Sequence, residues 1–203
     1  MRHWLAWLLL PWSFAGPSQA TVLVDYTFDA LVRESALIVR AQILDRFVEG
    51  PHAGHADDIH TVVTLRVVHV LKGDAQPNEI ELSFLGGTLN NEVLDISGQF
   101  IPRVGEEAIL FIDDPHGRHI NPLTGWFQGY FPIQQAAGQT YLDLSDRPDL
   151  ILANLNADPL LKKLLSLRVS EAEIEKRFPG YTRFLLEDFL TAIEIEVAAT
   201  ELP

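Results

Sequence analysis

The sequence predicts an all-β core, a small barrel of about five to seven strands, followed by a C-terminal pair of amphipathic helices. Two observations carry this prediction. Residues 21–144 contain short runs of alternating or β-branched apolar residues, and turn residues separate these runs. Residues 150–203 instead repeat their apolar residues at helical spacing. Glycines near the ends of the long strands favour a barrel over a sandwich.

The strands are expected at several places along residues 21–149. The clearest is the run rich in Val and Thr at 59–73, IHTVVTLRVVHVLKG. The run at 35–48 alternates with period two, and one helical turn at 28–34 precedes it. The other expected strands are 78–86, 106–114, 126–134 and 140–144, of which the last two form a hairpin with AAGQ at 136–139 as its turn.

Two helices are expected beyond residue 150. Ser170 and Glu173 have the spacing of a capping box, which predicts a helix start there, and Pro179-Gly180 ends this helix. The second helix is expected over 182–197. Its apolar stripe consists of Leu185, Phe189, Ala192, Ile193 and Val197. Packing of the stripe on the core is the favoured interpretation, and docking of the helices to a partner is the alternative.

The first twenty residues have the layout of a secretory signal peptide. Arg2 precedes an apolar run from Trp4 to Phe14, and the small-residue triplet at 18–20 predicts cleavage after Ala20. The run is shorter than the about 20 residues that span a bilayer. We therefore predict a signal peptide at 1–20, an OB-like β-barrel domain at 21–149 and a helical tail at 150–203. No membrane span is expected after the signal is removed.

The composition restricts the function classes further. The chain has no cysteine, so it forms no disulfide and offers no thiol nucleophile or Cys-ligated zinc site. An exported chain of this size without cysteine fits the bacterial periplasm, so we expect a periplasmic or secreted protein. The net charge of −13 repels polyphosphate, which disfavours nucleic acid as a partner.

The stretch LGGTLNN at 85–91 resembles a phosphate-binding loop, but its context argues against that interpretation. A phosphate loop needs a helix after the glycines, and EVLDISGQF at 92–100 is instead typical of a strand or a turn. Gly86 and Gly87 are therefore assigned to a bend at the end of a strand. Gly105 and Gly129 are assigned to structural turns as well.

The order of several short motifs carries a resemblance. SALIVRAQIL, IHTVVTLRVVHVLKG, FLGG, VLDISGQFIPRVGEEAILFID and GWFQGYFPI follow one another within about residues 29–134. This order resembles a group of uncharacterised exported bacterial proteins, which supplies no activity. Lys72-Gly73 and Gly105-Glu106 also resemble, more distantly, the netrin-like module of the tissue inhibitors of metalloproteinases. That resemblance implies an OB-like barrel, but the inhibitors use an N-terminal cysteine that this chain lacks.

Histidines supply two candidate metal sites, of which the second is formed by His116 and His119 beside Asp113 and Asp114. His52, His55 and His60 lie close to Asp57 and Asp58, and imidazoles with carboxylates can hold a divalent ion. Histidines without a metal are the favoured interpretation, so no cofactor is expected. The chain has no G-x-S-x-G motif, and none of the serines Ser83, Ser97 and Ser145 is expected to have a paired base.

The aromatic stretch at 126–131 is a candidate binding surface. In a strand, Trp126, Gln128 and Tyr130 would share one face and could form a platform on which a ligand stacks. Core packing is the favoured interpretation of the stretch. Together these patterns favour a non-enzymatic, soluble binding module of the bacterial envelope with a protein partner, in a protease-inhibitor-like or accessory role. The rival hypothesis is a divalent-metal-dependent hydrolase that uses the loop histidines.

Overall fold

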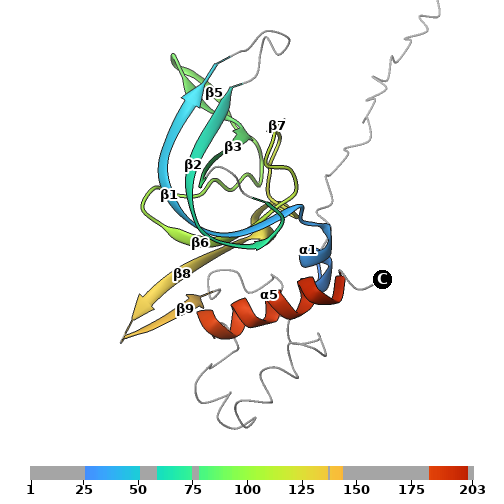
Figure 1. Ribbon diagram of the computed structural model, residues 1–203. Coiled ribbons are helices and arrows are strands. Elements are labelled where there is room, and N and C mark those ends of the chain that lie inside the picture. The colour runs from blue at the N-terminus through green and yellow to red at the C-terminus, as the bar shows by residue number, and fades with distance from the viewer. Residues whose placement is uncertain (1–25, 51–58, 75–77, 137, 144–182, 201–203) are drawn as a thin grey trace, which may run out of the picture.

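The computed structural model describes residues 26–50, 59–74, 78–136, 138–143 and 183–200. One mixed sheet has the strand order β10-β9-β8-β6-β1-β2-β3-β7, and β4 and β5 form a separate hairpin (Figure 1). The strands are β1 Leu37–Glu49, β2 His60–Lys72, β3 Glu79–Leu85, β4 Gly87–Leu89, β5 Glu92–Leu94, β6 Glu107–Ile112, β7 Arg118–His119, β8 Tyr130–Ala136, β9 Gln139–Asp143 and β10 Arg183–Leu185. The helices are α1 Phe28–Glu34, the short 3-10 turn η1 Trp126–Gly129, and α5 Leu186–Thr200.

The predicted class, a β-rich core with a C-terminal helix, is confirmed. The predicted closed barrel is wrong. The strand order of the sheet has two ends, β10 and β7, and the strands therefore do not close on one another. The helix expected after Ser170 and the expected signal peptide lie outside the described residues. The helix predicted over 182–197 begins later, at Leu186, because Arg183–Leu185 pair with β9 as an antiparallel strand.

The two faces of the sheet support two hydrophobic clusters. Residues that alternate along β1 divide between them: Val39, Ala41 and Ile43 lie in one cluster, whereas Ile38 lies in the other. The first cluster lies between β1, β2, β3 and β6, and the β-branched residues of β2 are suited to such a pleated surface. The second cluster joins the sheet to the two helices.

Helix α5 lies beside α1 and along the sheet (Figure 1), and its apolar side chains join the cluster that both contribute to. The Phe189 ring lies 5.6 Å from the Phe28 ring and 4.9 Å from the Phe131 ring, measured between centroids. Burying one such side chain stabilises the fold by about 1.5–3 kcal/mol. The buried residues of α5 are Leu186, Phe189, Ala192, Ile193 and Val197. The stripe is therefore part of the core, as the favoured interpretation of the sequence has it.

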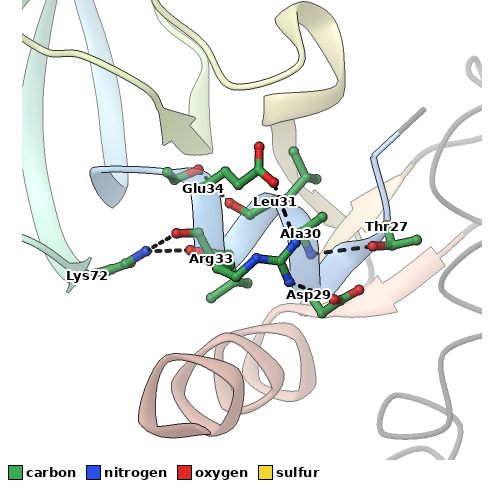
Figure 2. Close-up of polar contacts among 9 residues, drawn as sticks. Thr27, Asp29, Ala30, Leu31, Arg33, Glu34 and Lys72 are labelled. Carbon is green, nitrogen blue, oxygen red and sulfur yellow. Dashed lines mark hydrogen bonds and ion pairs between the residues drawn. The ribbon is translucent and has the colours of Figure 1, made fainter. Parts of the chain in front are cut away.

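Helix α1 is fixed at both of its ends by side chains (Figure 2). The Thr27 hydroxyl accepts a hydrogen bond from the Ala30 amide at 3.4 Å, which is an N-cap. At the other end, the Lys72 ammonium donates to the carbonyl oxygens of Val32 at 2.6 Å and Arg33 at 2.9 Å. The last residue of β2 thus satisfies carbonyls that a helix end leaves without an intrahelical partner.

The LGGTLNN stretch forms a bend and a tight hairpin. Gly86 has φ +109° and Gly87 has φ +144°, and a Cβ on Gly87 would lie 2.8 Å from the Thr61 hydroxyl. The chain then turns back through Asn90 and Asn91, with φ of +50° and +68°, between β4 and β5. Two central residues with positive φ are the mark of a two-residue hairpin turn, and asparagine tolerates this conformation.

Candidate functional site

An apolar groove of about 220 Å³ lies beside the β4–β5 hairpin. Its apolar lining consists of Leu85, Val93, Leu94, Ile96 and Ile101. Asp95 is the one carboxylate among the lining residues. Val93 is 71% exposed, the largest exposed fraction among the large apolar side chains that the structure describes. The volume is below the about 300–1,000 Å³ of pockets that hold small molecules, so the groove suits one large side chain rather than a cofactor.

Gln99 holds the outer wall of this groove in place. Its amide nitrogen donates to the carbonyl oxygens of Leu85 at 3.1 Å and Ile120 at 2.7 Å. Its amide oxygen accepts a hydrogen bond from Asn121 at 2.9 Å. One side chain therefore joins the 95–101 segment to the end of β3 and to the backbone of Ile120, the residue after β7.

A second feature is a set of polar side chains on the sheet face opposite the first hydrophobic cluster, which we call the outer polar cluster: Glu49, His60, Ser83 and Arg118. They come from four neighbouring strands, β1, β2, β3 and β7. Glu49 is opposite His60, and Ser83 is opposite Arg118, in the register of the strands. Residues opposite each other in register share a face, which explains how residues so far apart in sequence meet.

Ser83 and His60 form the shortest contact in the outer polar cluster. The Ser83 hydroxyl lies 2.9 Å from His60 Nδ1, so the prediction that Ser83 has no paired base is wrong. His60 is only 3% exposed and Ser83 is partly buried. A general base must reach the proton it removes from a bound substrate, and a ring enclosed to this degree is poorly placed for that. The pair is therefore better understood as a diagonal cross-strand hydrogen bond.

Arg118 is the least satisfied member of the outer polar cluster. Its Nη2 lies 3.5 Å from Glu49 Oε2. Its Nε and Nη1 are buried and have no hydrogen-bond partner among the residues that the structure describes. A buried donor without an acceptor is rare in folded proteins and calls for an explanation.

The histidines predicted as metal ligands are only partly covered by the structure. His60 is engaged with Ser83, as described above, and His52 and His55 lie outside the described residues. Among the described residues, no group of three or more His, Asp or Glu side chains could hold a metal ion. His119 pairs instead with one carboxylate, Asp114, at 3.1 Å. Hydrogen bonding by the His116 amide, and then His119, lowers the pKa of Asp114 below its usual value.

The predicted aromatic platform at 126–131 has a different geometry from the one expected. Residues 126–129 form η1 rather than a strand, because Gly125 at φ +63° and Trp126 at φ +60° turn the chain. Gln128 and Tyr130 are each 2% exposed. The Gln128 oxygen accepts a hydrogen bond from the Tyr26 amide at 2.8 Å, and the Tyr130 hydroxyl donates to Glu106 at 2.5 Å. These two side chains are therefore part of the interior, and only Trp126 is partly exposed.

Gly105 and Gly129, the two remaining glycines predicted in turns, require the absence of a side chain for different reasons. Gly105 has φ +89°, and a Cβ on it would have nothing within 4 Å. Gly129 has no positive φ, but a Cβ there would lie 2.5 Å from the Thr124 carbonyl oxygen and 2.8 Å from that of Phe111. Gly105 thus serves a turn conformation, whereas Gly129 allows close backbone packing.

Comparison of this chain with protein-family models, with curated proteins and with solved structures gave no match. The chain contains no cysteine and so forms no disulfide. Among the described residues, none of the helices has the length and apolar character needed to cross a membrane.

Proposed function

We propose that this chain is a non-enzymatic module that binds a protein partner through the groove beside the β4–β5 hairpin. The observation that carries the proposal is the combination of an apolar groove with a largely exposed apolar side chain in its lining. Val93, which lines the groove, is 71% exposed. Protein-binding surfaces often contain a central apolar pocket that receives one anchor side chain of the partner. The size of the groove suits such an anchor.

The topology of the sheet supports an OB-like assignment as part of this proposal. Strands β1, β2 and β3 are antiparallel neighbours, β6 pairs with β1, and β7 is parallel to β3. The chain after β7 then returns to β6, with hydrogen bonds from the Asp113 amide to Pro122 and from the Thr124 amide to Phe111, each 2.9 Å. Residues 122–124 therefore connect β7, at one end of the sheet, to β6. OB-like domains bind their ligands on strand faces and adjoining loops, which is where the groove lies.

The cellular location belongs to the same proposal. The signal-like sequence at 1–20 supports export, and the absence of cysteine suits a bacterial envelope. The partner would then be an exported or envelope protein. The acidic chain favours a partner surface that carries basic residues around its apolar anchor, because Asp95 lines the groove.

A matched pair of variants tests the proposal. Val93→Asp places a charge at the rim of the groove, and Val68→Asp places the same charge at a 53% exposed position of β2 outside the groove lining. Tagged wild-type protein and both variants would be crosslinked in the envelope of the source organism, and the retained proteins would be quantified by mass spectrometry. A partner retained by the wild type and by Val68→Asp but lost from Val93→Asp supports the proposal. Equal retention by all three proteins, or no specific retention, refutes it.

A further inference from the structure

A pocket of about 460 Å³ lies where β1, the beginning of β9 and the beginning of α5 meet. Figure 1 shows the beginning of α5 beside β9. The volume lies within the about 300–1,000 Å³ of pockets that hold small molecules. Gly138, Gln139 and Glu187 are exposed, so a ligand can enter from solvent. We call this site the α5 pocket, and its lining consists of Arg40, residues 138–140, residues 185–187 and Leu190.

The α5 pocket lies where the second hydrophobic cluster ends. Ile38 and Leu142 belong to that cluster. Arg40 and Thr140 are two residues away from them along β1 and β9, so they lie on the same face of the sheet. Both strands therefore change from an apolar to a polar residue at the pocket, next to the leucines of α5. A pocket with an apolar part and a few polar groups is typical of small-molecule sites.

Two side chains of opposite charge line the α5 pocket. Nε of Arg40 donates to Glu107 Oε1 at 2.6 Å, which fixes the guanidinium, and the Arg40 side chain is 27% exposed. Glu187 lies in the first turn of α5 and is exposed. A ligand with a single charge meets one group of its own sign, Glu187 for an anion and Arg40 for a cation. A ligand with a carboxylate and an ammonium group can pair with both side chains.

We propose that the α5 pocket binds a zwitterionic ligand with an apolar aliphatic side chain, which is the chemistry of a free aliphatic amino acid or an aliphatic dipeptide. The carboxylate accepts hydrogen bonds from the Nη groups of Arg40, and the ammonium group donates to Glu187. The aliphatic side chain packs against Leu185, Leu186 and Leu190, which form the apolar part of the lining. The α5 pocket and the groove beside the β4–β5 hairpin share no lining residue, so this proposal does not depend on the proposed partner binding.

The backbone amide signals of Thr140 and Leu190 in an NMR spectrum of the full chain report on the pocket from two of its sides. The chain is titrated with L-leucine and with leucyl-leucine at constant ionic strength. Three further compounds each lack one feature of leucine: leucinamide has no carboxylate, 4-methylpentanoate has no ammonium group, and glycine has no aliphatic side chain. The expected result is a saturable shift of both signals with leucine or leucyl-leucine, at a several-fold lower concentration than with any of the three. The tighter of the two ligands identifies the source of the zwitterion.

The amide signals of Thr88 and Val93, which line the groove, serve as the internal control and should not shift. The proposal is overturned if neither leucine nor leucyl-leucine shifts the Thr140 and Leu190 signals saturably, a result that needs no variant to fold. It is also overturned if the control signals respond alike, or if leucinamide and 4-methylpentanoate act at the same concentration as the tighter ligand. In the last case the pocket recognises only apolar surface.

The variant Glu187→Gln tests the partner of the ammonium group. It should raise the half-saturating concentration of the tighter ligand several-fold and reduce the preference for this ligand over 4-methylpentanoate. Glu194→Gln makes the same change at an exposed position of α5 outside the pocket and should alter neither quantity. Equal effects of the two substitutions would overturn the assignment of Glu187, because the change would then come from the overall charge of the helix.

Discussion

The ammonium of Lys72 lies 2.6 Å from the carbonyl oxygen of Val32, and it also donates to the next carbonyl, that of Arg33 (Figure 2). The end of β2 thereby holds the end of α1, although the two elements are separated by the whole β1–β2 hairpin. The lysine-glycine pair at 72–73, which the sequence offers only as a motif, thus has a physical role. Lys72 caps the helix, and Gly73 lets the chain pass close to Ala36.

Removing the ammonium of Lys72 should destabilise the protein. Lys72→Met keeps most of the apolar stem but removes both hydrogen bonds to the end of α1. We expect a loss of about 1.5 kcal/mol in the free energy of unfolding, because hydrogen bonds from charged groups are stronger than neutral ones. Urea unfolding monitored by circular dichroism measures this change in the free energy of unfolding. Arg66→Met is the control: both partners of the Arg66–Glu79 pair are more than half exposed, so we expect at most about 0.5 kcal/mol. Equal losses in the two variants would contradict the capping role.

Gly73 should tolerate a side chain less well than another glycine of similar backbone conformation. Gly73 has φ +80°, and a Cβ on it would lie 2.4 Å from the Ala36 carbonyl oxygen. Gly98 has φ +78°, but a Cβ there meets nothing within 4 Å. Gly98→Ala should therefore cost only the backbone strain, about 1 kcal/mol. Gly73→Ala should cost about 3 kcal/mol, because a backbone atom must also move. Thermal and urea unfolding compare them, and a Gly73→Ala variant as stable as Gly98→Ala would disprove the close approach.

Helix α5 should behave as core and not as a detachable arm. Phe189 is buried among Phe28, Phe131 and the sheet, so Phe189→Ala should lower the free energy of unfolding by about 3–5 kcal/mol. Glu194→Ala, at an exposed position of the same helix, should change it by no more than about 0.5 kcal/mol. A Phe189→Ala variant of wild-type stability would mean that α5 docks only loosely on the sheet.

Asp114 should make stability depend on pH in the acid range. Hydrogen bonding by the His116 amide, and then His119, lowers the pKa of this carboxyl below 3.8, so folding favours its charged form. The stabilisation is therefore complete above pH 3.8 and is lost as the pH falls through the folded-state pKa. The difference in stability between the wild type and Asp114→Asn should shrink as the pH falls from about 5 through the normal pKa of the carboxyl. A difference that stays the same down to pH 3 would contradict the assignment.

Local sequence patterns predict most of the strands because period two and β-branched residues report on backbone and burial together. The runs at 35–48, 59–73, 78–86 and 106–114 correspond to β1, β2, β3 and β6 within a few residues. Predictions fail where a turn competes with the pattern. Trp126 to Gly129 alternate like a strand, but Gly125 and Trp126 with positive φ begin a 3-10 turn. The hairpin at 87–94 carries a readable sequence signal, the pair Asn90-Asn91 at its turn.

The outer polar cluster could not be predicted from local patterns. Ser83 and Arg118 meet because β7, only two residues long, pairs in parallel with β3. Nothing in the sequence around Arg118 specifies that register. The groove has the same origin, since its wall depends on one side chain, Gln99, that reaches two strand ends. Sites built by pairing of distant strands are visible only once the register is known.

The contact between the rings of Phe28 and Phe189 also determines when the protein can complete its fold. Residues near the beginning and near the end of the described chain share one cluster, so this layer stays incomplete until α5 has been synthesised. Until then, the face of the sheet that carries Phe111 and Phe131 is exposed to water. Such long-range closure slows folding. A nascent chain would therefore remain open for longer, which is the state in which a polypeptide can still be threaded through a translocation channel.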